Sequence, residues 1–186
     1  NTIEFNNGET EGTPGSITVA DFPGQWNYNH WNSVIGGADN PAGVGDKSDG
    51  IVINGGVIFA GSTPEDNCTA IGGGGNDYGG VTINGGTVTA VVSSTGTAIG
   101  GGIGYSDKGG DTDVVIEDGT IYAYNLGIKS GNGIDNFPKF VPAAAIGGGG
   151  SNGAAGNLNA NITINGGKIY AQSMGGAAIG GGCSAN

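Results

Sequence analysis

The sequence predicts an all-β protein: a right-handed, single-stranded parallel β-helix (solenoid) of about five coils. The prediction rests on an excess of glycine and β-branched residues, a repeated pair of short motifs, and an apolar period of two within each repeat. The chain has 186 residues, of which 44 are glycine. Nineteen are Ile and twelve are Val, against two Leu and no Arg. Because β-branched residues favour strands and helical proteins rely on Leu, Ala, Glu and Lys, this composition excludes a helical bundle.

Two short motifs alternate along the chain. The first joins two apolar segments through a polar, glycine-containing corner, in IVINGGVIFA (51–60), VTINGGTVTA (81–90), VVIEDGTIYA (114–123) and ITINGGKIYA (162–171). The second, AIGG, follows each copy, at 70–73, 98–101, 145–148 and 178–181, and a fainter VIGG lies at 34–37. Strict alternation through four copies predicts a repeat architecture.

Within each copy, inward and outward residues alternate. In VTINGGTVTA, Val81 and Ile83 point to one side and Thr82 to the other. Three short strands in about 30 residues make one coil of a solenoid, whose coils pair as parallel sheets. Two isoleucine columns are then expected, namely Ile53, Ile83, Ile116 and Ile164, and Ile71, Ile99, Ile146 and Ile179. A β-propeller and an antiparallel barrel are the alternatives, but a propeller blade needs four antiparallel strands and each copy offers three.

The chain divides into two parts. Residues 1–50 are expected to form an N-terminal cap and a first, irregular coil, and residues 51–186 to form the regular repeats. A long insertion is expected at 124–144, where Pro138 and Pro142 oppose joining the interior of a sheet. The insertion is expected either to fold its aromatic residues over the coil or to form a binding lip.

The motifs VTINGGTVTA and AIGGG resemble the glycine-rich β-helix repeats of surface proteins from gut clostridia and related Gram-positive bacteria. The resemblance covers residues 51–186 well and residues 1–50 poorly. It implies an extracellular protein, either secreted or associated with the cell surface. A looser similarity to pectate-lyase-type and clostridial polysaccharide-binding β-helices implies contact with a polysaccharide or a cell-surface glycan. No catalytic residue of those families is carried over to this chain.

Charge and cysteine content limit the partners. The formal net charge is −11, from sixteen Asp and Glu against five Lys. With so little positive charge to offset phosphate repulsion, nucleic acid is excluded as a partner. No apolar run approaches the roughly 20 residues that span a bilayer, so no membrane insertion is expected. Cys68 and Cys183 are predicted to be small buried residues rather than a disulfide or a zinc site.

Aromatic residues are the candidate glycan-binding residues. Phe59, Tyr122 and Tyr170 share an outward column with Thr89, and Tyr124 follows in the insertion. Such rings either stack against sugars or pack between coils under the insertion. Trp26 and Trp31 form either a cap over the open N-terminal end or a second sugar-stacking platform.

Polar corners supply two further candidates. Asp77, Asp107, Asp111 and Asp113 are expected at one edge of the stacked coils, where they either hold Ca²⁺, the candidate cofactor, or form a solvated acidic corner. Asn54, Asn84 and Asn165 are expected to form a structural ladder that Glu117 interrupts.

Three functions follow from these features, in order of preference. They are a glycan-binding or adhesive module, a structural stalk, and a polysaccharide lyase or glycoside hydrolase. Enzymatic activity is disfavoured, because the chain lacks an Arg base and its lone His30 has no evident nucleophile partner. Near the C-terminal residues 182–186 no polar cap is visible, so continuation of the chain or end-to-end contact with another subunit is expected there.

Overall fold

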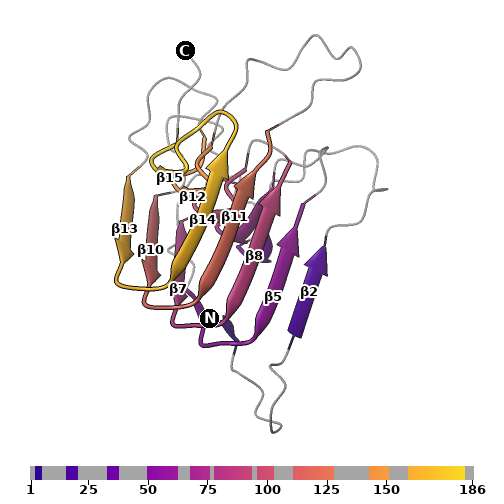
Figure 1. Cartoon of the computed structure of the whole chain (residues 1–186). Coiled ribbons are helices and arrows are strands. Elements are labelled where there is room, and N and C mark those ends of the chain that lie inside the picture. Colours follow the sequence, from indigo (N-terminus) through magenta and orange to yellow (C-terminus); the bar gives the residue numbers. More distant parts are fainter. Residues whose placement is uncertain are drawn as a thin grey trace, which may run out of the picture.

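The structure, a computed structural model, describes residues 3–5, 16–20, 33–37, 50–62, 68–75, 78–93, 96–102, 111–127, 143–150 and 159–182. In these ranges the regular secondary structure consists of β-strands (Figure 1). Within the same ranges there is no helix of the length and hydropathy needed to cross a membrane.

The strands form three five-stranded sheets that the chain visits in turn. The first sheet contains β1 (Ile3–Phe5), β4 (Ile51–Ile53), β7 (Gly79–Ile83), β10 (Thr112–Ile116) and β13 (Ala160–Ile164). The second contains β2 (Ser16–Ala20), β5 (Val57–Gly61), β8 (Thr87–Val92), β11 (Thr120–Asn125) and β14 (Lys168–Ser173). The third contains β3 (Ser33–Gly36), β6 (Thr69–Gly72), β9 (Ile99–Gly100), β12 (Ile146–Gly147) and β15 (Ile179–Gly180).

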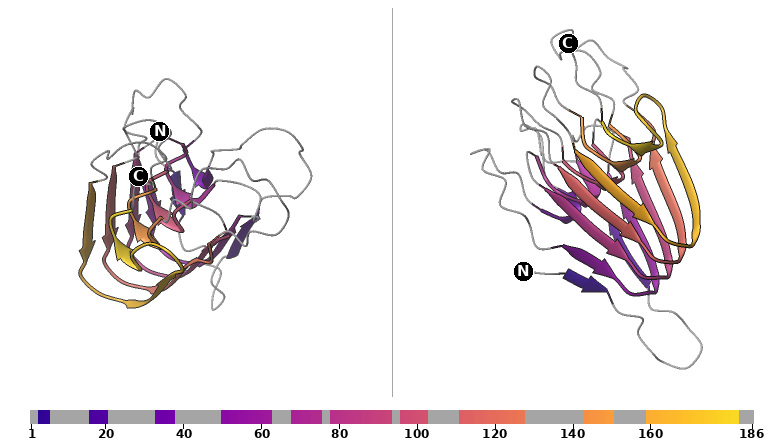
Figure 2. Two further views of the ribbon diagram at one scale, coloured as in Figure 1. Left: turned by 90° about the horizontal axis from the view of Figure 1, so that it is seen from above. Right: turned by 90° about the vertical axis from the view of Figure 1, so that its left-hand side faces the viewer.

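Each inner strand of a sheet pairs with the equivalent strand one repeat before and one repeat after it. The pairings between the described strands are all parallel. Figure 2 shows successive repeats lying side by side along a common axis. This arrangement confirms the predicted all-β class and fits a solenoid, whereas a propeller or an antiparallel barrel requires antiparallel neighbours.

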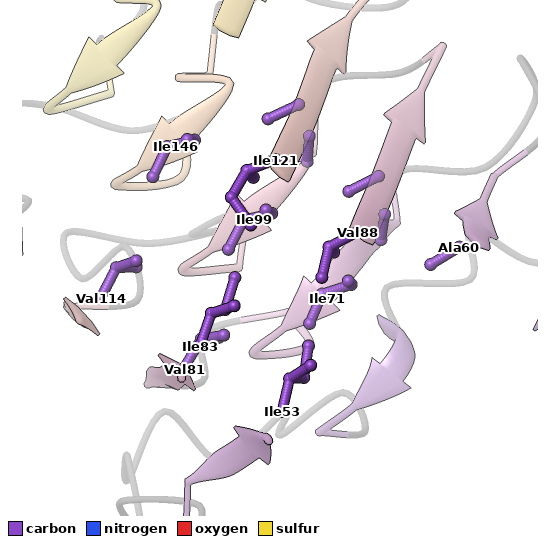
Figure 3. Close-up of a cluster of buried hydrophobic side chains, with 14 of the residues drawn as sticks. Ile53, Ala60, Ile71, Val81, Ile83, Val88, Ile99, Val114, Ile121 and Ile146 are labelled. Carbon is purple, nitrogen blue, oxygen red and sulfur yellow. The ribbon is translucent and has the colours of Figure 1, made fainter. Parts of the chain in front are cut away.

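The core consists of inward side chains that stack in register. Ile53 pairs with Ile83, Ile83 with Ile116, and Ile116 with Ile164, as the period of two predicts. The second predicted column, from Ile71 to Ile179, is likewise confirmed in the third sheet. Figure 3 shows isoleucines and valines of the three sheets gathered in one interior. Most of these side chains have no exposed surface, and each contributes about 1.5–3 kcal/mol on burial.

The first glycine of AIGG occupies a position that no other residue fits. In three successive repeats it is Gly72, Gly100 and Gly147, with φ values of 139°, 135° and 135°. A Cβ atom on Gly100 would lie 2.1 Å from the carbonyl oxygen of Gly147 in the next repeat. Both the positive φ and the close backbone approach therefore require glycine. A backbone hydrogen bond also joins the two repeats at this point, because Gly101 N–H donates to Gly147 O at 2.9 Å.

One buried polar side chain ties two turns of the chain together. Asn125, at the end of β11, donates from Nδ2 to the carbonyl oxygens of Gly96 at 2.8 Å and Ala143 at 3.2 Å. Its Oδ1 accepts from Gly127 N–H at 3.0 Å. The equivalent residues in the neighbouring strands are Val92 and Ser173. Asn125 thus joins the backbone of Gly96, Ala143 and Gly127 through one side chain.

In the last described repeat, formed by β13, β14 and β15, two core side chains are partly exposed. Ile164 and Ile179 occupy core columns, yet 41% and 42% of their surfaces are exposed. The equivalent Ile116 and Ile146, one repeat earlier, are completely buried. The outer edges of these three strands also end their sheets. Partly exposed core side chains and the last described strand of each sheet therefore lie at the same end of the described repeats.

The predicted division of the chain can be compared with the strands at two points. Within 1–50, the three described strands join the three sheets, and Ile3 pairs with Ile51 in register. β11 continues to Asn125, so Tyr124 lies on a strand rather than in the insertion. Residues 128–142 of the predicted insertion lie outside the described residues.

Candidate functional site

The outward side of the second sheet carries the predicted aromatic column. Phe59 pairs with Thr89, Thr89 with Tyr122, and Tyr122 with Tyr170, which confirms that the four residues are equivalent. Figure 1 shows their strands β5, β8, β11 and β14 side by side. We call the outward side chains of these four strands the aromatic face. The exposed fraction is 49% for Tyr170 and 39% for Phe59.

Two of these tyrosines stack on each other. The ring centroids of Tyr122 and Tyr170 are 4.9 Å apart and their planes differ by 9°. Tyr124 lies against Tyr122 at 6.4 Å with a tilt of 34°. The spacing of about 4.8 Å between paired strands brings like side chains into this arrangement. Part of the ring surface that was expected to contact a ligand is therefore buried in contacts between repeats. Tyr170 nevertheless remains about half exposed to solvent.

The aromatic face is nearly uncharged. Its outward side chains are Val57, Phe59, Thr87, Thr89, Val91, Thr120, Tyr122, Tyr124, Lys168, Tyr170 and Gln172. They include one cation and no carboxylate, although the whole chain has sixteen Asp and Glu. Apolar surface and hydroxyl groups thus lie together on one sheet. Such a surface suits a neutral, hydroxyl-rich ligand better than an ion.

Two acidic residues, Asp111 and Asp113, lie at the start of β10 in the first sheet. Asp113 accepts hydrogen bonds from the Tyr78 hydroxyl and from Asn161 Nδ2, the latter at 2.8 Å. Asp111 accepts from the backbone N–H of Asn159 at 3.1 Å. These carboxylates therefore link neighbouring repeats. Neither Tyr78 nor Asn161 was predicted to be a partner of these carboxylates. The strand register, which places Asn161 beside Asp113, is the signal that could have identified Asn161.

The predicted calcium site is described only in part. Asp77 and Asp107 lie outside the described residues, and Asp111 and Asp113 have the partners just given. Among the residues that the structure describes, no group of three or more His, Cys, Asp or Glu side chains is placed to hold a metal ion.

The environment of Tyr78 disfavours the tyrosinate. Burial is the main cause of its raised pKa, followed by the hydrogen bond to Asp113 and by the negative charges of Asp113 and Asp111. Because the pKa is higher in the folded than in the unfolded chain, neutral Tyr78 stabilises the fold fully below the unfolded value of about 10. That stabilisation is lost as the pH rises through the folded value.

We expect Tyr78 of the folded protein to ionise well above the ordinary tyrosine pKa, measured by the ultraviolet absorbance of tyrosinate. Tyr78→Phe removes this late step, and Asp113→Asn moves it back toward the ordinary pKa because the acceptor charge is gone. The fold of the Tyr78→Phe variant is also expected to lose less stability above pH 10. Identical absorbance titrations of the wild type and the Tyr78→Phe variant above about pH 10 contradict the assignment.

The corner ladder consists of two separate hydrogen bonds. Asn84 Nδ2 donates to Asn54 Oδ1 at 2.7 Å, as expected for stacked amides. Asn165 Nδ2 donates to Glu117 Oε2 at 2.9 Å, because a carboxylate oxygen accepts from an amide as well as an amide oxygen does. The ladder is therefore interrupted between Asn84 and Glu117, while Glu117 itself is the partner of Asn165.

The remaining sequence candidates fall into two groups. Cys68 is buried, as predicted. Trp26, Trp31 and Cys183 lie outside the described residues.

Comparisons with protein families, with curated proteins and with solved structures found no match to this chain.

Proposed function

We propose that the chain is an extracellular, cell-surface-associated module that binds a neutral polysaccharide or cell-surface glycan on its aromatic face. The observation that supports this proposal is the combination of exposed rings and hydroxyl groups with the lack of carboxylates on that face. The proposal includes a right-handed β-helix of about five coils. The resemblance to surface proteins of gut clostridia and related bacteria supports the extracellular location.

Carbohydrate chemistry explains the preference for a neutral polymer. One side of many sugar rings presents C–H groups, which pack against aromatic rings, while their hydroxyls hydrogen-bond to Thr and Tyr hydroxyls. Phe59 and Tyr170 supply exposed ring surface, and Thr89 lies in the same column. A polyanionic glycan is disfavoured because the net charge of −11 repels it over a Debye length of about 8 Å at physiological salt.

The test is a panel of soluble neutral polysaccharides, with and without Ca²⁺, followed by calorimetry on the ligand that binds. We expect Tyr170→Ala and Phe59→Ala each to weaken binding about tenfold, equivalent to about 1.4 kcal/mol. Thr163→Ala is the matched control, because Thr163 is exposed on the first sheet and lies outside the aromatic face. This variant should leave the affinity unchanged. Absence of binding across the panel, or equal loss in the control, contradicts the proposal.

The second candidate is a structural stalk without a ligand of its own. The Tyr122–Tyr170 stack and the fully buried core support it, because both rigidify the repeat array. For a stalk, we expect Tyr122→Ala and Tyr170→Ala to change thermal stability without changing any binding property.

The third candidate is a polysaccharide lyase or glycoside hydrolase. A hydrolase needs two carboxylates about 5–9.5 Å apart that flank the scissile bond. Among the described residues, the aromatic face has none, and Asp111 and Asp113 are hydrogen-bonded between repeats. A reducing-sugar assay and an absorbance assay for unsaturated products on the same panel decide this candidate.

A further inference from the structure

Phe59 differs from the other rings of the aromatic face in how its ring lies. A Cβ atom added to Gly61, two residues further along β5, would lie 3.0 Å from Cε1 and 3.3 Å from Cζ of Phe59. Residues two apart on a strand point to the same side of the sheet. The Phe59 ring therefore leans along its own strand and fills the outward space that Gly61 leaves free.

The other three strands of the aromatic face carry a side chain at the position of Gly61. The equivalent residues in β8, β11 and β14 are Val91, Tyr124 and Gln172. Tyr122 places its ring against that of Tyr170 with the planes only 9° apart, so each of these two rings gives one face to the other. Of the four strands, β5 is therefore the one with room for a ring to lie along the sheet.

The surroundings of Phe59 supply hydroxyl groups on both sides of its ring. In the column of Phe59, the neighbouring residues are Thr18 of β2 and Thr89 of β8. Figure 1 shows β2, β5 and β8 side by side, and paired strands are about 4.8 Å apart. Because β5 is an inner strand of its sheet, described strands border the ring on both sides. Phe59 and Thr18 are both exposed, so ring surface and hydroxyl groups are open to solvent together.

We propose that Phe59, held over Gly61, is the platform on which one sugar ring of an extended, β-1,4-linked neutral glycan stacks, and that Gly61 is its positioning residue. This inference rests on the proposed function and names the class of glycan. A pyranose whose hydroxyls are all equatorial carries C–H groups on its two faces and hydroxyls around its rim. The C–H groups pack against the Phe59 ring, and the rim hydroxyls hydrogen-bond to Thr18 and Thr89.

The side chains next to the platform favour an extended glycan over a curved one. The sugars on either side of the stacked ring must pass over the outward side chains of neighbouring strands. On β8 these are Thr87, Thr89 and Val91, which are all short and form no wall beside the ring. A β-1,4-linked glucose chain is a ribbon that stays close to such a surface. An α-1,4-linked glucose chain curves and lifts its next sugar away from the sheet.

The experiment is calorimetry on the full 186-residue chain with cellohexaose and maltohexaose, two glucose hexasaccharides that differ only in linkage. We expect cellohexaose to bind at least about tenfold more tightly than maltohexaose. Gly61→Ala displaces the Phe59 ring without straining the backbone, because Gly61 has no positive φ, and we expect it to weaken cellohexaose binding about tenfold. Gly85→Ala adds a Cβ at an ordinary contact distance of 3.5 Å and is the control whose affinity should not change.

A double variant separates positioning of the ring from a general loss of structure. Phe59→Leu keeps an apolar side chain but removes the flat ring, and we expect about tenfold weaker binding of cellohexaose. Adding Gly61→Ala to Phe59→Leu should weaken binding no further, because Gly61 acts through the ring. Thermal melts followed by circular dichroism should be similar for all variants. If Gly61→Ala alone disturbs the fold, Phe59→Leu still decides whether the ring is the platform.

Failure of this inference and failure of the proposed function give different results. Equal affinities for the two hexasaccharides overturn the platform alone, as does binding of another neutral glycan of the panel without binding of cellohexaose. Unchanged binding by Phe59→Leu, or additive losses in the double variant, also overturn it. Absence of binding to every glycan overturns the proposed function and the platform together.

Discussion

Gly100→Ala is expected to lower the free energy of unfolding by at least about 3 kcal/mol. The added Cβ would lie 2.1 Å from Gly147 O, an atom of a rigid backbone, at a φ of 135° that L side chains rarely adopt. Relief requires the two repeats to separate. Separation breaks the Gly101–Gly147 hydrogen bond and pulls Ile99 away from Ile146.

The matched control is Gly85→Ala in an Asn-Gly-Gly corner. There the added Cβ would lie 3.5 Å from its nearest neighbour, Asn54 O, which is an ordinary contact. We expect this variant to stay within about 1 kcal/mol of wild type. The measurement is the urea concentration at the midpoint of unfolding, with unfolding monitored by circular dichroism. Equal midpoints for the two variants contradict the assignment of a special role to the AIGG glycine.

Asn125→Asp is expected to destabilise the fold by about 3–5 kcal/mol at neutral pH. A carboxylate at this position faces the carbonyl oxygens of Gly96 and Ala143, which now accept hydrogen bonds from the amide. It has no donor to offer them. Asn54→Asp is the control, because Asn54 is exposed and a carboxylate oxygen can still accept from Asn84 Nδ2.

The sign of the pH dependence follows from the same contacts. Burial and the facing carbonyl dipoles raise the pKa of the new carboxyl above its unfolded value. Relative to wild type, Asn125→Asp should therefore recover stability as the pH falls through the raised folded pKa, since the protonated acid donates one hydrogen bond. Thermal melts of both proteins at neutral and acidic pH measure this. A constant difference in melting temperature between pH 7 and pH 4 contradicts the explanation.

The sequence was informative where a residue's role repeats. Ile83 and Ile99 could be placed in their columns because the period of two and the motif spacing determine both side and register. The outward column of Phe59, Tyr122 and Tyr170 followed from the same register. The strands of the first 50 residues were harder, because VIGG at 34–37 is a weak copy and IEF at 3–5 has no Asn-Gly-Gly after it.

Side-chain partners could not be predicted in the same way. The repeat places Tyr122 beside Tyr170, but whether the rings stack or splay depends on rotamers. Tyr78 lies in a segment between motifs, so its hydrogen bond to Asp113 has no counterpart in the repeat pattern. Asn125 replaces a valine of the previous repeat, and its role depends on carbonyl groups of loops that the motif does not include.

The register of β7 has a consequence for how such a chain changes length over generations. β7 meets β4 on one side and β10 on the other through residues of the same kind. Deletion of residues 81–113 in one recombination event would place Ile51 beside Val114 and Ile53 beside Ile116, pairs equivalent to those that it removes. A deletion that joins non-equivalent positions of two strands instead shifts the register and exposes the core isoleucines. Changes in the number of strands are therefore expected to come in whole repeats, whereas the loops between strands can vary in length, as the unequal spacing of the motifs that begin at Ile51, Val81, Val114 and Ile162 shows.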